Sequence, residues 1–228
     1  MNAVPDWWRG SRIVNVVVDN DSWVLPYADR LVESLRQHGD DATLVRRHED
    51  VREGAVAFYL GCVKITPDNV LARNRRNLVV HASDLPRGRG FSPLVLLILE
   101  GAGRLPVCLI EASGEVDSGP VVYKEWITYE GHELNEELRR PLGEMHVSLS
   151  LRFMSEAAPP AGVPQTGDGT CYRRRTRADS WLDPDQSLAA QFDLLRVVDN
   201  ERYPAFFDFR GQRYVLKIEK APGESESA

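Results

Sequence analysis

Residues 77–93, NLVVHASDLPRGRGFSP, constrain the fold more than any other part of this chain. The apolar run at 78–80 is typical of a buried strand, and His81 stands at its carboxyl end. A turn follows, then a basic loop interrupted by glycines, then a helix that we expect to begin at residues 92–93. In an open α/β sheet, ligands bind just outside the carboxyl ends of the strands. The pattern therefore predicts that His81 lies where chemistry takes place.

Apolar runs of strand type alternate with helical patterns over the first two thirds of the chain. Residues 12–19 form a continuous β-branched run, as a strand of a parallel sheet would, and residues 26–39 form an amphipathic pattern that a glycine ends. The other expected elements are strands at 43–45, 55–60, 78–81, 107–111 and 121–129, and helices at 67–73, 92–101 and 134–154, with Pro141 as a candidate break in the last helix. This alternation predicts an α/β domain with a doubly wound, mostly parallel sheet.

A segment of different composition separates this domain from the rest of the chain. Residues 156–170, EAAPPAGVPQTGDGT, are rich in proline and glycine and indicate a linker. After it come a basic patch at 172–177, a helical pattern at 187–198, and two strands joined by a turn, at 205–209 and 213–218. We therefore expect a main domain at 1–155, a linker at 156–170, and a small α+β appendage at 171–228.

Composition and charge exclude several classes of protein. The net charge of −6 over 228 residues argues against non-specific electrostatic binding of nucleic acid. No apolar run approaches the ~20 residues of a membrane span, and the N-terminus lacks the apolar core of a signal peptide. Cys62, Cys108 and Cys171 are far apart and form no Cys-x-x-Cys pair, so we expect a reduced, cytoplasmic and metal-free protein. We expect neither a nucleic-acid nor a membrane partner, and a homodimer is left open.

The segment at 77–93 resembles the formyltransferase family, which includes methionyl-tRNA formyltransferase, glycinamide ribonucleotide formyltransferase and the short sugar N-formyltransferases. In that family a strand ends in Asn-x-His, and x-Ser-Leu-Leu-Pro, a basic Arg-Gly loop and a helix-opening proline follow. The positions that agree here are His81, Ser83, Leu85, Pro86, Arg87, Arg89, Gly90 and Pro93. Residues 61–67, GCVKITP, are similar to the family's folate loop, and residues 106–119 are similar to its second strand and Asp-x-Gly motif. The three segments occur in the expected order.

The resemblance implies a Rossmann-like catalytic domain at 1–155 in which His81 and Asp117 are catalytic and Ser83 assists them. A histidine at a strand end can hydrogen-bond a developing oxyanion or carry protons, and a carboxylate can hold its tautomer or accept the amine proton. Taken alone, His81 would more often be a core histidine and Asp117 a turn residue. One position departs from the family: Val79 stands where the family has asparagine, and Asn77 lies about 13 Å from His81 at ~3.3 Å per residue. Another donor, such as Ser83, a backbone N–H or the side chain of Lys64, then has to replace the asparagine, or the chain is slow or inactive.

The resemblance also implies two binding regions. The folate donor would lie against Gly61, Cys62, Val63, Lys64, Ile65, Val116, Ser118 and Gly119. The acceptor would lie against Pro86, Arg87, Gly88, Arg89, Gly90, Arg174 and Tyr203. Without the resemblance, the first region is an ordinary strand-to-helix turn and the arginines are a solvated edge. The remaining histidines, at positions 38, 48, 132 and 146, lie in charged stretches, and we expect them on the surface.

We therefore expect an N-formyltransferase that uses 10-formyltetrahydrofolate as donor and the primary amine of a small molecule as acceptor. Residues 194–207 resemble a helix-turn of the sugar N-formyltransferases, and arginines bind phosphate well, so a nucleotide-linked amino sugar is the expected acceptor. A tRNA acceptor is not expected, because a chain this short and acidic lacks a large basic C-terminal domain. A siderophore-type or amino-acid acceptor, a formyltetrahydrofolate hydrolase and an inactive folate-binding homologue stay open as alternatives.

Overall fold

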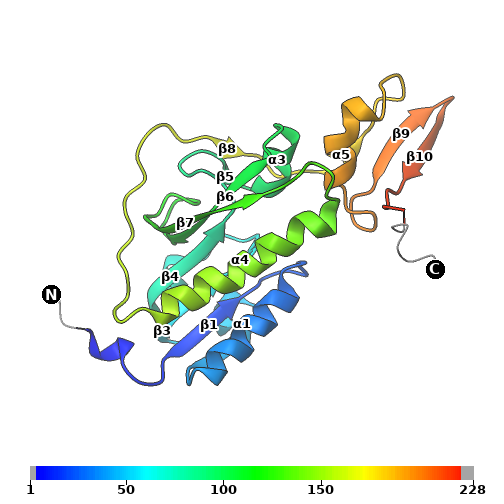
Figure 1. The fold of residues 1–228 in the computed structure, drawn as a ribbon. Coiled ribbons are helices and arrows are strands. Elements are labelled where there is room, and N and C mark those ends of the chain that lie inside the picture. Colours follow the sequence, from blue (N-terminus) through cyan, green and yellow to red (C-terminus); the bar gives the residue numbers. More distant parts are fainter. Residues whose placement is uncertain (1–3, 222–228) are drawn as a thin grey trace, which may run out of the picture.

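The computed structural model describes residues 4–221 and is built around one six-stranded sheet (Figure 1). The strand order is β2-β1-β3-β4-β6-β7. The strands are β1 (Ile13–Val17), β2 (Asp41–Val45), β3 (Gly54–Tyr59), β4 (Asn74–His81), β6 (Arg104–Glu111) and β7 (Val121–Thr128). The pairs among β2, β1, β3 and β4 are parallel, whereas β6 is antiparallel to both of its neighbours. The predicted mostly parallel α/β sheet is confirmed.

Two helices cover one face of the sheet (Figure 1). Helix α1 (Leu25–Gln37) buries Ala28, Leu31, Val32 and Leu35, which recur at helical spacing. Burial of a leucine side chain of this kind contributes roughly 1.5–3 kcal/mol. Helix α4 (Asn135–Ser155) packs against α1 so closely that a Cβ on Gly143 would lie 2.3 Å from the ring of Tyr27. Pro141 does not break α4, which continues through it as one helix.

The opposite face is closed by smaller elements. A second apolar cluster, which includes Val17, Val45, Tyr59 and Val70, lies beneath the 3-10 turn η2 (His48–Asp50) and the short helix α2 (Asp68–Leu71). Among the described residues, no helix is long and apolar enough to cross a membrane.

The segment at 156–170 runs along the molecule from the end of α4 to β8 (Figure 1). Strand β8 (Cys171–Tyr172) pairs in parallel with β5 (Arg89–Gly90), which precedes helix α3 (Pro93–Leu99). Five further elements follow β8 in the described part of the chain: the 3-10 turns η3 (Arg177–Ser180) and η4 (Ala189–Gln191), helix α5 (Phe192–Val197), and the antiparallel hairpin of β9 (Ala205–Phe209) and β10 (Gln212–Leu216). A 3-10 turn, η1 (Asp6–Trp8), precedes β1. The helix and the two strands expected after the linker are present. The domain boundaries at 155 and 170 stay a prediction.

Candidate functional site

His81 ends strand β4 and faces the open edge of the sheet. Its side chain is almost completely buried, with 6% of the residue exposed. Nε2 lies 2.8 Å from the carbonyl oxygen of Gly88. A carbonyl oxygen accepts hydrogen bonds and cannot donate them, so Nε2 carries a proton in this arrangement. Nδ1 is consequently the ring nitrogen that remains for chemistry.

Asp117 supplies the carboxylate that faces Nδ1. Its Oδ2 lies 3.4 Å from Nδ1 of His81 and accepts a hydrogen bond of 2.9 Å from the backbone N–H of Gly90. Asp117 has a φ of 49°, in the left-handed region that aspartate tolerates better than most residues. The loop is held against β6, since a Cβ on Gly119 would lie 1.8 Å from the carbonyl oxygen of Glu111. Nδ1 of His81 and Oδ2 of Asp117 thus face each other at the end of β4.

A cavity of about 470 Å³ opens in front of this pair and brings together the three groups of residues that the sequence analysis singled out. Of the predicted residues, those that line it are Gly61, Cys62, Val63, Lys64, Ile65, His81, Gly90, Val116, Asp117, Arg174 and Tyr203. Those that do not line it are Ser83, Pro86, Arg87, Gly88, Arg89, Ser118 and Gly119. The volume lies within the range of ordinary small-molecule sites.

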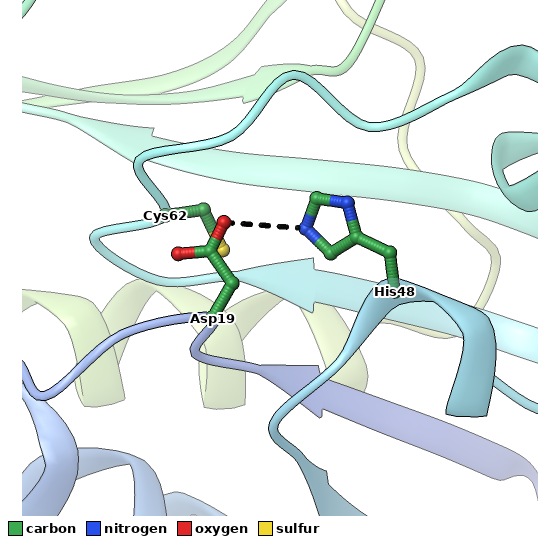
Figure 2. A group of neighbouring side chains, drawn as sticks. All are labelled: Asp19, His48 and Cys62. Carbon is green, nitrogen blue, oxygen red and sulfur yellow. Dashed lines mark ion pairs between the residues drawn. The ribbon is translucent and has the colours of Figure 1, made fainter.

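The loop at 61–65 is shaped by Asp19, which follows β1. The carboxylate of Asp19 accepts hydrogen bonds of 2.9 Å from the backbone N–H groups of Val63 and Lys64. Burial alone would raise the pKa of Asp19, but hydrogen bonds from Asn20 and the loop, together with the positive charge of His48, outweigh it and lower the pKa. Figure 2 shows Asp19 close to both His48 and Cys62, with a dashed line to His48. The carboxylate of Asp19 therefore fixes the backbone of this loop.

Ser83 and the basic loop lie behind the histidine. Ser83 is completely buried, and its hydroxyl has no partner among the described residues. The guanidinium of Arg89 donates to Oε1 of Gln165 at 2.8 Å. Thr170 Oγ1 accepts the N–H of Gly88 at 2.9 Å. These contacts hold the loop in place, and of its members only the backbone at Gly90 reaches the cavity wall.

Cationic side chains from the C-terminal part of the chain form the far wall of the cavity. Arg174, Arg175 and Arg202 line it, as does Arg139 of α4, which is paired with Asp199 at 2.9 Å. Burial lowers the pKa of Arg175, and its Nε is buried without a hydrogen-bond partner among the described residues. An unpaired donor and several positive charges on a cavity wall suit an anionic ligand.

His146 of α4 is a cavity residue that the sequence analysis misplaced. The expectation that His48 and His146 lie on the surface is wrong, because only 8% and 4% of these residues are exposed. Burial, and to a smaller extent the charge of His81, lowers the pKa of His146 to about 3. Nδ1 of His146 has no hydrogen-bond partner among the described residues, and its ring packs edge-on against Trp23. The cavity thus contains a second imidazole, neutral at neutral pH.

Val79 lines the cavity two residues before His81, and Asn77 does not replace it. The amide nitrogen of Asn77 donates to the carbonyl oxygen of Leu71 at 2.8 Å, and its oxygen accepts from the hydroxyl of Tyr59 at 3.3 Å. Both contacts point Asn77 toward α2 and β3. If the reaction needs a polar group where the family has asparagine, that group has to come from an element other than β4.

Comparison with known proteins shows which family the chain is similar to. No protein-family model matches the chain. A methionyl-tRNA formyltransferase from Acidiphilium cryptum is 29% identical over 192 residues, which are 83% of this chain and 62% of that protein. The chain spans 48% of the length of another methionyl-tRNA formyltransferase, from Roseobacter denitrificans. The resemblance seen in the sequence is confirmed.

Solved structures show the same fold over nearly the whole chain. A methionyl-tRNA formyltransferase from Clostridium thermocellum has a TM-score of 0.76 at 21% identity and covers 92% of this chain and 93% of that one. A sugar N-formyltransferase from a Shewanella species has a TM-score of 0.66 at 16% identity and covers 93% and 99%. HypX from Aquifex aeolicus in complex with tetrahydrofolic acid has a TM-score of 0.70 at 14% identity and covers 92% and 38%.

Proposed function

We propose that this chain, a member of the formyltransferase family by sequence and fold, transfers a formyl group from 10-formyltetrahydrofolate to the primary amine of a small acceptor. The observation that carries the proposal is the contact between His81 and Asp117 at the wall of the cavity. A proton-holding pair, an ordered loop and an arginine-lined wall then surround one space of about 470 Å³.

The residues around the loop at 61–65 fit the folate donor, which supplies the formyl group when bound. Val63, Leu71, Val79 and Ile110 give this part of the cavity an apolar lining, as a flat heterocycle requires. The backbone of the loop is fixed by Asp19 and offers polar groups beside that lining. Tetrahydrofolic acid in the structurally similar HypX supports the same class of donor here.

His81 and Asp117 perform the proton transfer in the proposed reaction. An amine that gains a formyl group must lose a proton, and Nδ1 of His81 with Oδ2 of Asp117 offers a place for it at the cavity wall. The bond from Nε2 to the carbonyl of Gly88 fixes the ring so that Nδ1 keeps this role. Such acid–base assistance accelerates reactions roughly 10²–10⁴-fold. Val79 stands where the family has a polar asparagine. His146 is a neutral polar side chain that lines the same cavity. We assign to His146 the contact with the reacting groups that the asparagine makes in the family.

The arginine wall supports an anionic acceptor, and we propose a nucleotide-linked amino sugar. Arg174, Arg175 and Arg202 can bind phosphate groups, and Tyr203 offers a half-exposed ring beside them. The sugar N-formyltransferase among the similar structures supports this class. The methionyl-tRNA formyltransferases among the sequence relatives make tRNA the second candidate.

The proposal is tested by incubating the protein with 10-formyltetrahydrofolate and, separately, a panel of nucleotide amino sugars and methionyl-tRNA. Mass spectrometry should detect the gain of one CO unit on an amino sugar, and His81→Ala should abolish the gain. Formylation of methionyl-tRNA instead would show that the acceptor is tRNA and not an amino sugar. Formate release without an amine would show a hydrolase, and folate binding without turnover would show an inactive homologue. Absence of any folate-induced thermal shift would overturn the proposal.

A further inference from the structure

Three side chains of different chemistry meet beneath the loop at 61–65, outside the His81 site. Asp19 follows β1, His48 opens the turn after β2, and Cys62 follows β3. The sheet order β2-β1-β3 makes these three strands neighbours, and all three run in parallel. Their carboxyl ends therefore lie at one edge of the sheet, and Figure 2 shows the three side chains converging there.

The atoms that could bind a metal ion lie close together. One carboxylate oxygen, one imidazole nitrogen and the thiol sulfur are all within 4.8 Å of one another. Nε2 of His48 lies 3.4 Å from Oδ2 of Asp19. In tetrahedral zinc sites the bonds are roughly 2.0–2.3 Å long, so neighbouring ligand atoms are about 3–4 Å apart. Small side-chain movements would bring these three atoms to that spacing.

The imidazole of His48 lacks a hydrogen bond that a buried ring would normally make. Only 8% of His48 is exposed, and its Nε2 has no hydrogen-bond partner among the described residues. Buried polar atoms without partners are rare, and a bound ion is one accepted reason for them. An ion pair with Asp19 would account for the histidine alone. The thiol of Cys62 donates a weak hydrogen bond of 3.4 Å to the carbonyl oxygen of Val17, which a thiolate bound to an ion would give up.

The donor set distinguishes between metal ions. Thiolate, imidazole and carboxylate together are the ligands of zinc, whereas magnesium and calcium prefer oxygen ligands only. Three protein ligands leave one position of a tetrahedral ion for water or another molecule. Cys62 also lines the cavity, so an ion held by it would lie next to the loop at 61–65.

We propose that Asp19, His48 and Cys62 bind one zinc ion, which fastens the loop at 61–65 to the ends of β1 and β2. Binding converts the thiol of Cys62 to a thiolate and releases its proton to solvent, and no electron is transferred. Asp19 would then bind both the ion and the N–H groups of Val63 and Lys64, so the ion stabilises the loop through a residue that already shapes it.

Cobalt(II) tests the site directly, because a thiolate ligand gives cobalt a charge-transfer absorption that nitrogen and oxygen ligands do not give. The full chain, stripped with EDTA, should take up one cobalt per molecule with this band, and zinc should displace it. Zinc at a hundredfold excess over its Kd should raise the melting temperature by about 5–10 °C. Cys62→Ser should abolish the band and His48→Gln should weaken metal binding at least about tenfold. Cys171→Ser, which changes an exposed cysteine outside the cluster, and His38→Gln should bind as the wild type does.

Alkylation of the unaltered protein keeps the test independent of how the variants fold. Zinc should slow the reaction of Cys62 with iodoacetamide about tenfold or more, while the reaction of Cys171 in the same molecules stays unchanged. Cobalt binding without the charge-transfer band, or equal alkylation of Cys62 with and without zinc, would overturn the proposal. Neither measurement uses formyl transfer, so its outcome does not depend on the proposed function.

Discussion

The side-chain amide of Gln165 donates a hydrogen bond of 2.7 Å to the carbonyl oxygen of Asp117. The same nitrogen donates to the carbonyl oxygen of Gly119 at 2.8 Å, and Oε1 accepts from the guanidinium of Arg89 at 2.8 Å. One residue from the segment at 156–170 thus connects the loop of the candidate carboxylate to the basic loop that follows His81. The segment has the composition of a linker, but in the structure it braces the site.

Replacing Gln165 tests this bracing. Gln165→Ala removes four hydrogen bonds, two accepted from Arg89 and two donated to the carbonyl oxygens of Asp117 and Gly119. Each typically contributes ~0.5–1.5 kcal/mol, so the free energy of unfolding should fall by about 2–6 kcal/mol. A displaced Asp117 should lower kcat roughly ten- to hundredfold, since small misplacements of catalytic groups are costly. Urea unfolding and steady-state kinetics measure the two effects. Gln37→Ala, at the exposed end of α1, is the matched control, and an unchanged kcat in Gln165→Ala would refute the bracing role.

His81→Ala should lower kcat by about 10²–10⁴-fold, because it removes the nitrogen that we assign to proton transfer. The buried ring also donates to the carbonyl of Gly88, so thermal denaturation must accompany the kinetics. His38→Ala removes an exposed histidine at the end of α1 and should leave kcat unchanged. Near-normal turnover in a folded His81→Ala variant would show that His81 does not transfer the proton.

Asp117→Asn keeps the shape of the side chain and removes its negative charge. The variant can still accept the N–H of Gly90, so the loop should stay folded, but it can no longer hold a proton shared with His81. We expect a loss in kcat of about a hundredfold or more, with little change in KM. If thermal stability fell and the rate per folded molecule did not, Asp117 would be a turn residue only.

Sequence reasoning predicted the position of His81, which one strand and its own loop determine. The apolar run before His81 and the pattern of strands and helices place that residue at the sheet edge without knowledge of the tertiary structure. His146 could not be found in this way, because its stretch of α4 mixes polar residues such as Glu144 with apolar residues such as Val147, and only the packing of α4 shows that it is buried. Asp19, His48 and Cys62 lie on three separate loops, and the expectation of a metal-free chain considered only the spacing of cysteines. The sheet order, which the sequence does not specify, is what brings them together.

The buried His146 should make folding stability depend on pH. Its pKa is lowered to about 3 in the folded protein, against about 6.5 in the unfolded chain, so the unfolded chain binds the extra proton first as the pH falls. The contribution of His146 to stability is therefore fully present above about pH 6.5 and decreases toward acid. Between about pH 7.5 and pH 5 we expect a loss near 2 kcal/mol from this group. His146→Phe keeps an aromatic ring against Trp23 and should flatten the pH dependence of urea unfolding by that amount. Identical slopes in both proteins would contradict the buried neutral state.

Val79→Asn restores the residue that the family has two positions before its histidine. Val79 packs between two apolar clusters, beside Leu85 and Ile110 on one side and Tyr59 on the other. If His146 or another group already donates a hydrogen bond to the reacting atoms, the introduced amide adds nothing to the reaction. It is left partly without hydrogen-bond partners, which costs about 1–3 kcal/mol of stability. We therefore expect Val79→Asn to lower the free energy of unfolding by that amount without raising kcat. Val79→Leu, which has nearly the shape of asparagine but no amide, separates the effect of size from that of polarity. A rise in kcat in Val79→Asn alone would show that the chemistry lacks a donor, and that no other residue has replaced the family's asparagine.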